Sequence, residues 1–386
     1  MQQKDQQFQD LFSEFPTSTK EEWVAQVVKD LKGADWTEAL VWNANDGLQI
    51  QPFFRKEDYP LSFANSSQFL PGWEIRQEFY VSDVDSTNLK IKKALTGGLQ
   101  SVCLYLPNEL TKSQVELLFD DVYIEMITIH WSGEGAEASF RAYLEIGADR
   151  GLAKDSLMGS FWNENFPALH AEFGKDYPCI DFLTASIDHK LISTLNPIEQ
   201  IALLCAIGLE NYEKMDSADP NGIMFYTEIG KSYFSEIAKC RSLRQVWGNI
   251  VEAMGIGAKP EKIAMQATNA LHLRDLEDPY KNLLQSTTMA ISAVLGGCCS
   301  ISLLAMDDKD EERGYDSDFF QRIQNNIQLL LKHESHLDEV ADPLAGSYYL
   351  EHLCSEYTQQ AWALFQEIAK EGTENWIANK TISHEA

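Results

Sequence analysis

Three of the eight histidines stand at or just after short apolar runs that are typical of β-strands: His130, His189 and His272. Histidine is the side chain whose ordinary pKa, about 6.5, allows proton transfer near neutral pH. The other histidines lie in segments with helical spacing or in the C-terminal tail. These three are therefore the candidate acid–base residues, although a single histidine at a strand end can equally serve packing.

Other common catalytic signatures are absent from the sequence. There is no Walker-type phosphate loop, no G-x-G-x-x-G, no G-x-S-x-G and no H-E-x-x-H. The acidic run from Asp307 to Arg313 has no turn glycine in the ligand register, which favours a solvated loop over a cation site. Seven cysteines without a C-x-x-C pair indicate reduced packing residues, including the adjacent Cys298 and Cys299.

Composition narrows the class of protein. The 386 residues are 44% hydrophobic, which is enough for a sizeable core, and they carry a formal net charge of −28. Such a charge disfavours nucleic acid as a partner. The polar, acidic N-terminus does not resemble a secretory signal, and no apolar run is long enough to span a membrane. We therefore expect a soluble, cytoplasmic protein with neither membrane nor nucleic-acid partners.

The first seventy residues are expected to form an arm outside the main domain. Thr19 and Glu22 fit a capping box at the start of an amphipathic helix, and Gly33 suits its end. Two alternating runs then flank Asn45-Asp46-Gly47, which is a hairpin signal. A connector rich in Ser, Asn, Gln and Pro follows. The predicted units are thus an arm over residues 1–70 and a main domain over residues 71–386.

The main domain shows apolar runs that alternate with amphipathic segments, as in parallel strands joined by helices. Eight candidate strands fit a (β/α)8 TIM barrel in number and size, with a C-terminal helical extension. An open doubly wound sheet is the alternative, but it would normally carry a glycine-rich turn after its first strand. The candidate strands begin at Trp73, Ser101, Val122, Ala142, Cys179, Gly222, Lys262 and Ser300.

Several blocks of the sequence resemble, in order, the adenosylcobalamin-dependent methylmalonyl-CoA mutases. The N-terminal stretch FPTSTKEEWVAQVVKDLKGADWTEALVW is most similar to the small, or beta, subunit of the heterodimeric enzymes of this family. The resemblance covers nearly the whole chain. The further blocks are WEIRQEFY, NYEKMDSADPNGIMFYTEIGKSYFSEIAKCRSLRQVW, DPYKNLLQSTTMAISAVLGGCCSIS, NNIQLLLKHES and DPLAGSYYLEHL.

This resemblance implies a barrel of the kind that holds acyl-CoA along its axis, while a cobalamin domain supplies the deoxyadenosyl radical. His189 falls on the family's catalytic histidine, Arg76 on a substrate-binding arginine and Glu334 on a glutamate near the adenosyl group. No histidine has the Asp two places earlier that the cobalt-ligating motif requires. Adenosylcobalamin is therefore expected to be bound mainly by another chain, and not strongly by this one.

Other family positions have changed. The tyrosine before the catalytic histidine falls on Asp188, and the radical-shielding tyrosine falls on Glu78. The glutamine of strand seven falls on Thr268, and the histidine after strand eight falls on Ser302. Residues 163–182 contain no arginine for the substrate's free carboxylate. These departures predict a degenerate active site, because a carboxylate in place of an aromatic wall admits water and repels an anionic substrate.

Three hypotheses follow. In the first, the chain is a non-catalytic small subunit that stabilises a catalytic large subunit, the complex interconverting methylmalonyl-CoA and succinyl-CoA. In the second, the barrel is itself a catalyst for methylmalonyl- or isobutyryl-CoA and works with a separate cobalamin-binding chain. In the third, it is a free-standing CoA-binding or regulatory barrel, which the scarcity of basic residues in the expected loops disfavours.

Overall fold

The computed structural model of the chain describes residues 18–43, 48–55, 58, 71–162, 165–215, 218–305 and 316–385. The chain divides into two compact units, Met1–Tyr59 and Pro60–Ala386. The acidic run from Asp307 to Arg313 and the turn Asn45-Asp46-Gly47 lie outside the described residues. Over the described ranges, no helix has the length and apolarity needed to cross a membrane.

The first unit contains two helices and a two-stranded ladder. They are α2 (Lys20–Asp30), α3 (Trp36–Leu40), β1 (Trp42–Asn43) and β2 (Gln49–Ile50). The predicted capping box is confirmed, since Thr19 accepts a hydrogen bond from the Glu22 backbone N–H and Glu22 accepts one from that of Thr19. β1 and β2 pair antiparallel, as expected for the arms of a hairpin.

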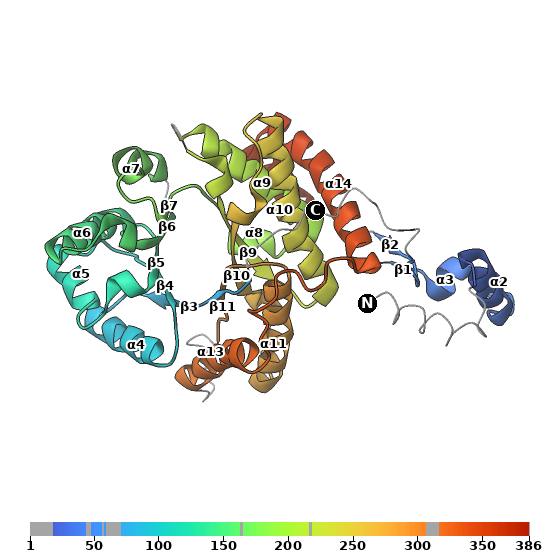
Figure 1. The fold of residues 1–386 in the computed structure, drawn as a ribbon, viewed down its shortest axis with the longest axis horizontal. Coiled ribbons are helices and arrows are strands. Elements are labelled where there is room, and N and C mark those ends of the chain that lie inside the picture. Colours follow the sequence, from blue (N-terminus) through green and yellow to red (C-terminus); the bar gives the residue numbers. More distant parts are fainter. Residues whose placement is uncertain are drawn as a thin grey trace, which may run out of the picture. The chain divides into compact units, whose positions relative to one another are not determined.

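The second unit is built on a nine-stranded parallel sheet that curves into a nearly closed barrel (Figure 1), which confirms the predicted α/β TIM-like fold. Its order is β7-β6-β5-β4-β3-β11-β10-β9-β8. The strands are β3 (Glu74–Tyr80), β4 (Ser101–Tyr105), β5 (Thr128–Ser132), β6 (Met158–Trp162), β7 (Ile180–Asp181), β8 (Thr184–Ala185), β9 (Met224–Ile229), β10 (Ala264–Asn269) and β11 (Ser300–Ser302).

The single gap in the ring lies between two strands that are consecutive in the chain. β7 pairs with β6, and β8 pairs with β9. Only Phe182 and Leu183 separate β7 from β8, and the Met224 N–H donates to the Leu183 carbonyl at 2.9 Å. The predicted fifth strand is therefore one extended segment that changes neighbours half-way, so covalent bonds close the ring there.

The fourth predicted strand was wrong. The residues from Ala142 to Gly147 belong to helix α6 (Ala136–Asp149), where most of them are buried. The true fourth strand, β6, escaped the prediction because Gly159 interrupts its apolar run. A Cβ at Gly159 would lie 1.8 Å from the carbonyl oxygen of Ile129 on the adjacent strand. The close approach of β5 and β6 thus requires a glycine at this position. The predicted total of eight strands included one false strand and omitted one true strand, so these two errors cancelled.

The third strand also differs from its prediction. Residues Ile124–Met126 form a short 3-10 turn, η3, and β5 begins only at Thr128. His130 therefore lies in the middle of β5 and not at its end, and its side chain is buried.

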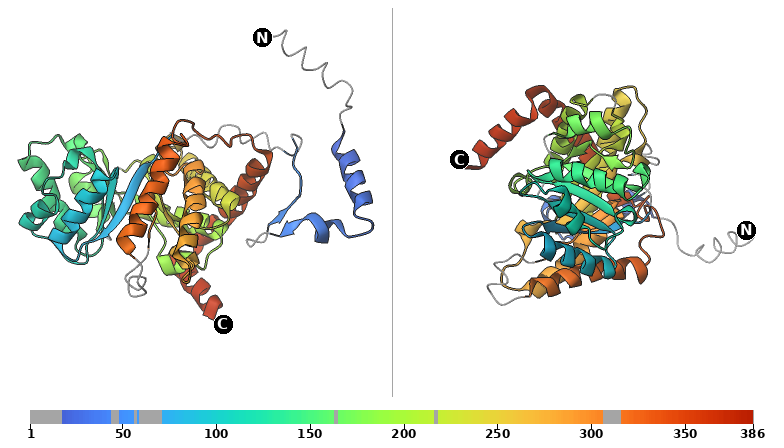
Figure 2. Two further views of the ribbon diagram at one scale, coloured as in Figure 1. Left: turned by 90° about the horizontal axis from the view of Figure 1, so that it is seen from below. Right: turned by 90° about the vertical axis from the view of Figure 1, so that its left-hand side faces the viewer.

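Helices cover the outside of the barrel. In Figure 1, α4 to α7 flank the strands from β3 to β7, and α9 to α11 flank those from β8 to β11; Figure 2 shows α13 beside β3. They are α4 (Val84–Thr96), α5 (Lys112–Leu118), α6, α7 (Phe166–Phe173), α8 (His189–Ile192), α9 (Pro197–Glu213), α10 (Tyr233–Ala253), α11 (Pro279–Leu295), α13 (Ser317–His333), α14 (Tyr348–Glu371) and α15 (Thr373–Glu385).

Alternation along the strands separates an apolar outer face from a polar inner face. Outward residues such as Val102, Ile129 and Phe225 are buried beneath the helices. The inward positions carry charged, amide, hydroxyl and imidazole groups instead of the branched aliphatic residues that usually fill TIM barrels. The interior is thus unusual in its chemistry.

A buried ion-pair network fastens the block DPLAGSYYLEHL to the barrel. Arg241 of α10 bonds the carboxylates of Asp342 and Glu351, the latter at 2.9 Å. Glu351 also accepts the Gly346 N–H at 3.0 Å. Ser347 is the N-cap of α14, but its side chain makes no capping bond. The proline-containing loop and the first turn of α14 therefore depend on one guanidinium.

Replacing Arg241 with methionine should lower the free energy of unfolding by about 3–5 kcal/mol, because two carboxylates would lose their partner in a nearly dry site. Urea denaturation measures this. The control is Lys154→Ala, which removes the exposed ion pair with Asp176 and should leave stability essentially unchanged. Equal stability of the two variants would contradict the assignment.

Candidate functional site

Side chains from several strands meet inside the barrel and fill its axis. Arg76 of β3 and Gln266 of β10 form a short hydrogen bond, and Gln266 Nε2 lies 2.9 Å from His130 Nδ1. Ser160 Oγ of β6 and Ser101 Oγ of β4 contact the same imidazole at 2.7 and 3.0 Å. All five side chains are buried. Together they form a continuous polar layer across the barrel, which we call the axial layer.

The Arg76 guanidinium is fully buried and has two further neighbours. Glu78 Oε1 lies 3.5 Å from Arg76 Nη2, and the ring of Tyr226 lies beneath the guanidinium, 5.4 Å from its carbon to the ring centroid. The Tyr226 hydroxyl donates to Glu78 at 3.0 Å. The predicted substrate arginine is thus bonded to residues of this chain, with the changed position Glu78 as one of its partners.

Burial sets the protonation states in this layer. It lowers the pKa of His130 well below the ordinary value, with the positive charge of Arg76 as a second cause. Burial also raises the pKa of Tyr226 well above its ordinary value, and the neighbouring Glu78 adds to this. Burial raises the pKa of Asp181, on β7 beside β6, to about 7. His130 and Tyr226 are therefore neutral at physiological pH.

A second cluster stands at the carboxyl ends of β8, β9 and β10, where TIM barrels carry their active sites. Glu228 of β9 is buried, and one of its carboxylate oxygens forms a short hydrogen bond with His189 Nδ1. Its other oxygen lies 3.6 Å from His272 Nδ1, beyond hydrogen-bond distance. Two of the three candidate histidines therefore converge on one carboxylate, and His130 does not join them.

A buried lysine lies beneath this cluster and holds it in place. Lys239 of α10 donates to the carbonyl oxygen of Glu228 at 2.5 Å and pairs with Glu236 at 2.6 Å. These contacts fix the end of β9 and the position of the Glu228 carboxylate. His189 keeps about half of its side chain exposed. A carboxylate that orients a solvent-facing imidazole is an arrangement capable of general acid–base chemistry.

The changed family positions near His189 have local structural contacts. Asp188 is the N-cap of α8, and its carboxylate accepts the Lys190 and Leu191 N–H groups at 2.9 and 3.4 Å. This cap starts the short helix that places His189. Thr268 of β10 lies between Glu228 of β9 and Ser302 of β11 in the register of the sheet. Ser302 in turn lies beside Arg76 of β3. Both hydroxyls are buried without a hydrogen-bond partner.

Glu334 lies at the other end of the barrel. It is the exposed C-cap residue of α13. Lys332, two residues before Glu334, donates to the carbonyl oxygen of Trp73, just before β3, and to Gln100, just before β4. This places the end of α13 near the amino ends of the strands. Glu334 and His189 are therefore not brought together in one site.

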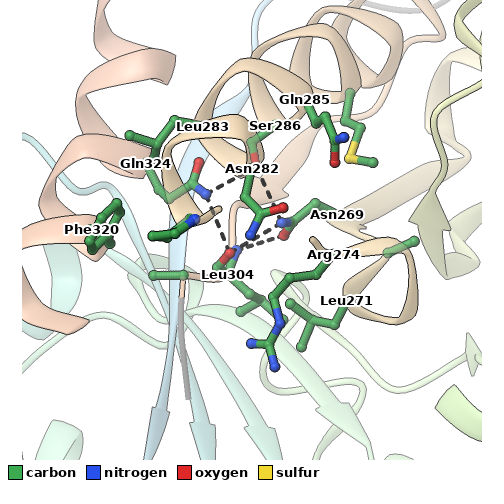
Figure 3. Close-up of a pocket in the computed structure, with 14 residues that line it drawn as sticks. Asn269, Leu271, Arg274, Asn282, Leu283, Gln285, Ser286, Leu304, Phe320 and Gln324 are labelled. Carbon is green, nitrogen blue, oxygen red and sulfur yellow. Dashed lines mark hydrogen bonds between the residues drawn. The ribbon is translucent and has the colours of Figure 1, made fainter. Parts of the chain in front are cut away.

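A third polar group lines a pocket between the loops after β10 and β11 and the helices α11 and α13 (Figure 3). Asn269 exchanges two hydrogen bonds with the backbone of Leu304, at 2.7 and 3.1 Å. Gln324 donates to Ser286 at 3.0 Å, and Figure 3 shows these side chains directed toward one another. Asn269 and Gln324 thus join the loop after β11 to β10 and to α11 and α13.

Comparison with known proteins agrees with this architecture. The methylmalonyl-CoA mutase family profile matches residues 207–384. A methylmalonyl-CoA mutase small subunit from Porphyromonas gingivalis is 30% identical over 405 residues, covering 94% of this chain and 64% of that protein. The chain belongs to the methylmalonyl-CoA mutase family. A small subunit from Streptomyces virginiae is 26% identical, covering 93% of this chain and 65% of that protein.

This member of the mutase family thus spans slightly less than two thirds of the length of these two relatives. Among solved structures, a dipeptide epimerase from Methylococcus capsulatus aligns with a TM-score of 0.33 at 11% identity, over 61% of this chain and 56% of that one. That likeness is too distant to bear on function.

The mutase family uses adenosylcobalamin. Glu334, which the resemblance places near the adenosyl group, lies at the end of the barrel opposite to His189. Over the described part of the chain, no three His, Cys, Asp or Glu side chains are grouped to hold a metal ion.

Sequence reasoning missed Glu228, Gln266 and Tyr226. All three lie on strands that were predicted, and alternation places Tyr226 and Glu228 on one face of β9. A polar residue at every second position of a buried strand was the available signal. It could have revealed the polar interior, but not which side chains meet across it.

We predict a pH dependence from His130. Its folded-state pKa lies below the unfolded value of about 6.5, so the stability that depends on the neutral imidazole is complete above that pH and is lost as the pH falls below it. Relative to His130→Asn, the native protein should lose up to about 1.4 kcal/mol per pH unit below pH 6.5.

Urea unfolding at pH 7.5, 6.5 and 5.5 measures this difference. Asp181 has the opposite dependence, because its raised pKa stabilises the folded state on protonation, but it is present in both proteins. Parallel stability curves for the native protein and His130→Asn would show that His130 does not titrate on unfolding.

Proposed function

We propose that this chain is a non-catalytic small subunit of a methylmalonyl-CoA mutase complex. The complex interconverts methylmalonyl-CoA and succinyl-CoA, and adenosylcobalamin is bound mainly by the catalytic large subunit. The role of this chain is to bind and stabilise that partner. Similarity to two small subunits over more than 90% of the chain supports the choice of partner.

The axial layer is the observation that carries this proposal. A catalytic barrel of this family holds acyl-CoA along its axis and therefore needs an open path there. In this chain Arg76, Gln266 and His130 occupy the axis, with Gln266 hydrogen-bonded to both of the others. Opening a path would leave a buried guanidinium without its partners, which is energetically expensive. The barrel is suited to stability, and not to threading a long ligand.

The residues at changed family positions support the same conclusion. Asp188 is engaged as a helix cap, and Glu78 is engaged by Tyr226 and Arg76. Their carboxylates add negative charge near the mouth, where an anionic substrate would have to enter. Thr268 and Ser302 are too short to reproduce the contacts of a glutamine and a histidine.

The arm provides a surface suited to a partner chain. Trp23 of α2 stacks on Phe53 at 4.5 Å between ring centroids and meets Trp36 edge-on at 6.1 Å. Despite this aromatic cluster, none of the residues of α2 is buried. An amphipathic helix normally buries its apolar face, and exposed aromatic clusters mark interaction surfaces.

A second candidate function is catalysis of an acyl-CoA rearrangement together with a separate cobalamin-binding chain. The observation in its favour is the His189–Glu228 pair, because the imidazole faces solvent at the carboxyl end of the barrel. It requires the axial layer to open, which disfavours it relative to the first proposal.

We expect the isolated chain not to bind methylmalonyl-CoA in titration calorimetry, because the axis is filled. In the complex with the large subunit, His189→Ala should change kcat by less than twofold. The catalytic alternative predicts a loss of about 100-fold or more for a general acid. Micromolar binding by the isolated chain together with such a loss would overturn the non-catalytic assignment.

The arm prediction concerns assembly. Trp23→Ala should weaken association with the large subunit by about tenfold or more, because a central aromatic residue would be lost from the contact. Lys29→Ala, on an exposed position of the same helix, is the matched control and should bind normally. Co-expression and affinity measurement test both variants. Failure of the native chain to co-purify with a catalytic subunit would refute the proposal itself.

A further inference from the structure

An open groove with a cavity volume of about 190 Å³ lies between helices α4 and α13 on the outside of the barrel. This volume is below the roughly 300–1,000 Å³ of drug-sized pockets, so the groove suits only a small group. Most neighbouring barrel helices pack against each other, whereas this pair leaves a passage that reaches down to Gln77 on the outer face of β3. Nothing in the mutase-like interior or in the arm accounts for it.

The charge of this groove is opposite to that of the protein. Lys90, Lys93 and Arg322 line it with three positive charges, against the single carboxylate of Asp318. The local net charge is therefore +2, in a chain where 59 acidic residues face 31 basic ones. Such a concentration of cations in an acidic protein would draw an anion into the groove.

The floor of the groove is polar and fixed in place. Asn325 donates to Gln77 Oε1 at 2.9 Å, and Gln321 donates to Asn325 at 3.2 Å and to the Leu303 carbonyl at 3.0 Å. These bonds tie α13 to β3 and to the loop after β11. Arg322, on α13, is thus carried by a helix that is fixed to the barrel, which lowers the entropic cost of binding.

The rim can adapt to a ligand. Lys93 and Asp318 form an ion pair of 2.9 Å across the groove, with 67% and 59% of their side chains exposed. An ion pair this exposed contributes little, so Lys93 can exchange Asp318 for a ligand oxygen at small cost. Arg322 adds a planar guanidinium, which suits the paired oxygens of a phosphate.

We propose that the groove between α4 and α13 binds the phosphate group of a small phosphomonoester. A phosphate monoester carries about −1.5 to −2 charges near pH 7, which matches the net charge of +2, whereas a single carboxylate would not neutralise it. The site is independent of the proposed role as a small subunit, since it uses neither the axial layer nor the arm.

Titration calorimetry of the full chain with inorganic phosphate and with phenyl phosphate, at constant ionic strength set with sodium chloride, tests the proposal. Saturable binding at one site is expected. The variant Lys90→Gln/Arg322→Gln should weaken it by about tenfold or more, because two charge-assisted contacts are lost. Lys92→Gln is the matched control, since this lysine belongs to the same helix but does not line the groove.

Circular dichroism and thermal melting should show both variants folded, because the substituted side chains lie outside the core. Binding to either phosphate that is lost in the double variant and kept in Lys92→Gln supports the site. The proposal is overturned if neither phosphate binds saturably, if Lys92→Gln loses as much affinity as the double variant, or if poly-glutamate binds as tightly as phenyl phosphate.

Discussion

A guanidinium without any exposed surface is the constraint around which the barrel interior is organised. Arg76 cannot lose its charge, so the chain must surround it with acceptors and an aromatic face. Gln266 and Glu78 face its two terminal nitrogens and Tyr226 supplies the aromatic face, while Nε has no hydrogen-bond partner among the described residues. Gln266 in turn requires His130, and His130 requires hydroxyls on the strands beside it. The polarity of this layer of the inner face follows from these contacts.

Buried cations paired with carboxylates also occur outside the barrel interior. Arg241 joins α10 to the start of α14, and Lys239, two residues earlier, joins α10 to the end of β9. One helix therefore holds both the C-terminal block and the carboxylate that orients His189. The cluster at the carboxyl end of the barrel is therefore anchored by the same helix as the start of α14.

Sequence patterns predicted the architecture well, because the outward faces of the strands and the helix stripes obey strong periodicities. They failed at β6, where Gly159 is needed for close strand approach and interrupts the apolar pattern. They also misplaced His130, since a 3-10 turn before β5 carries the same apolar residues as a strand. His189 and His272 were selected correctly as strand-end residues, but their shared partner Glu228 was not. That contact joins residues 39 positions or more apart, and only the register of the sheet brings them together.

The short covalent link between β7 and β8 has a consequence for the geometry of the ring. Strands held only by hydrogen bonds can slip by two residues and still pair every amide. Here Phe182 and Leu183 are the whole length of the joint, so the two edges of the curved sheet cannot slide past each other. One covalent joint thereby fixes the stagger of the ring, and with it the depth at which each inward side chain sits along the axis.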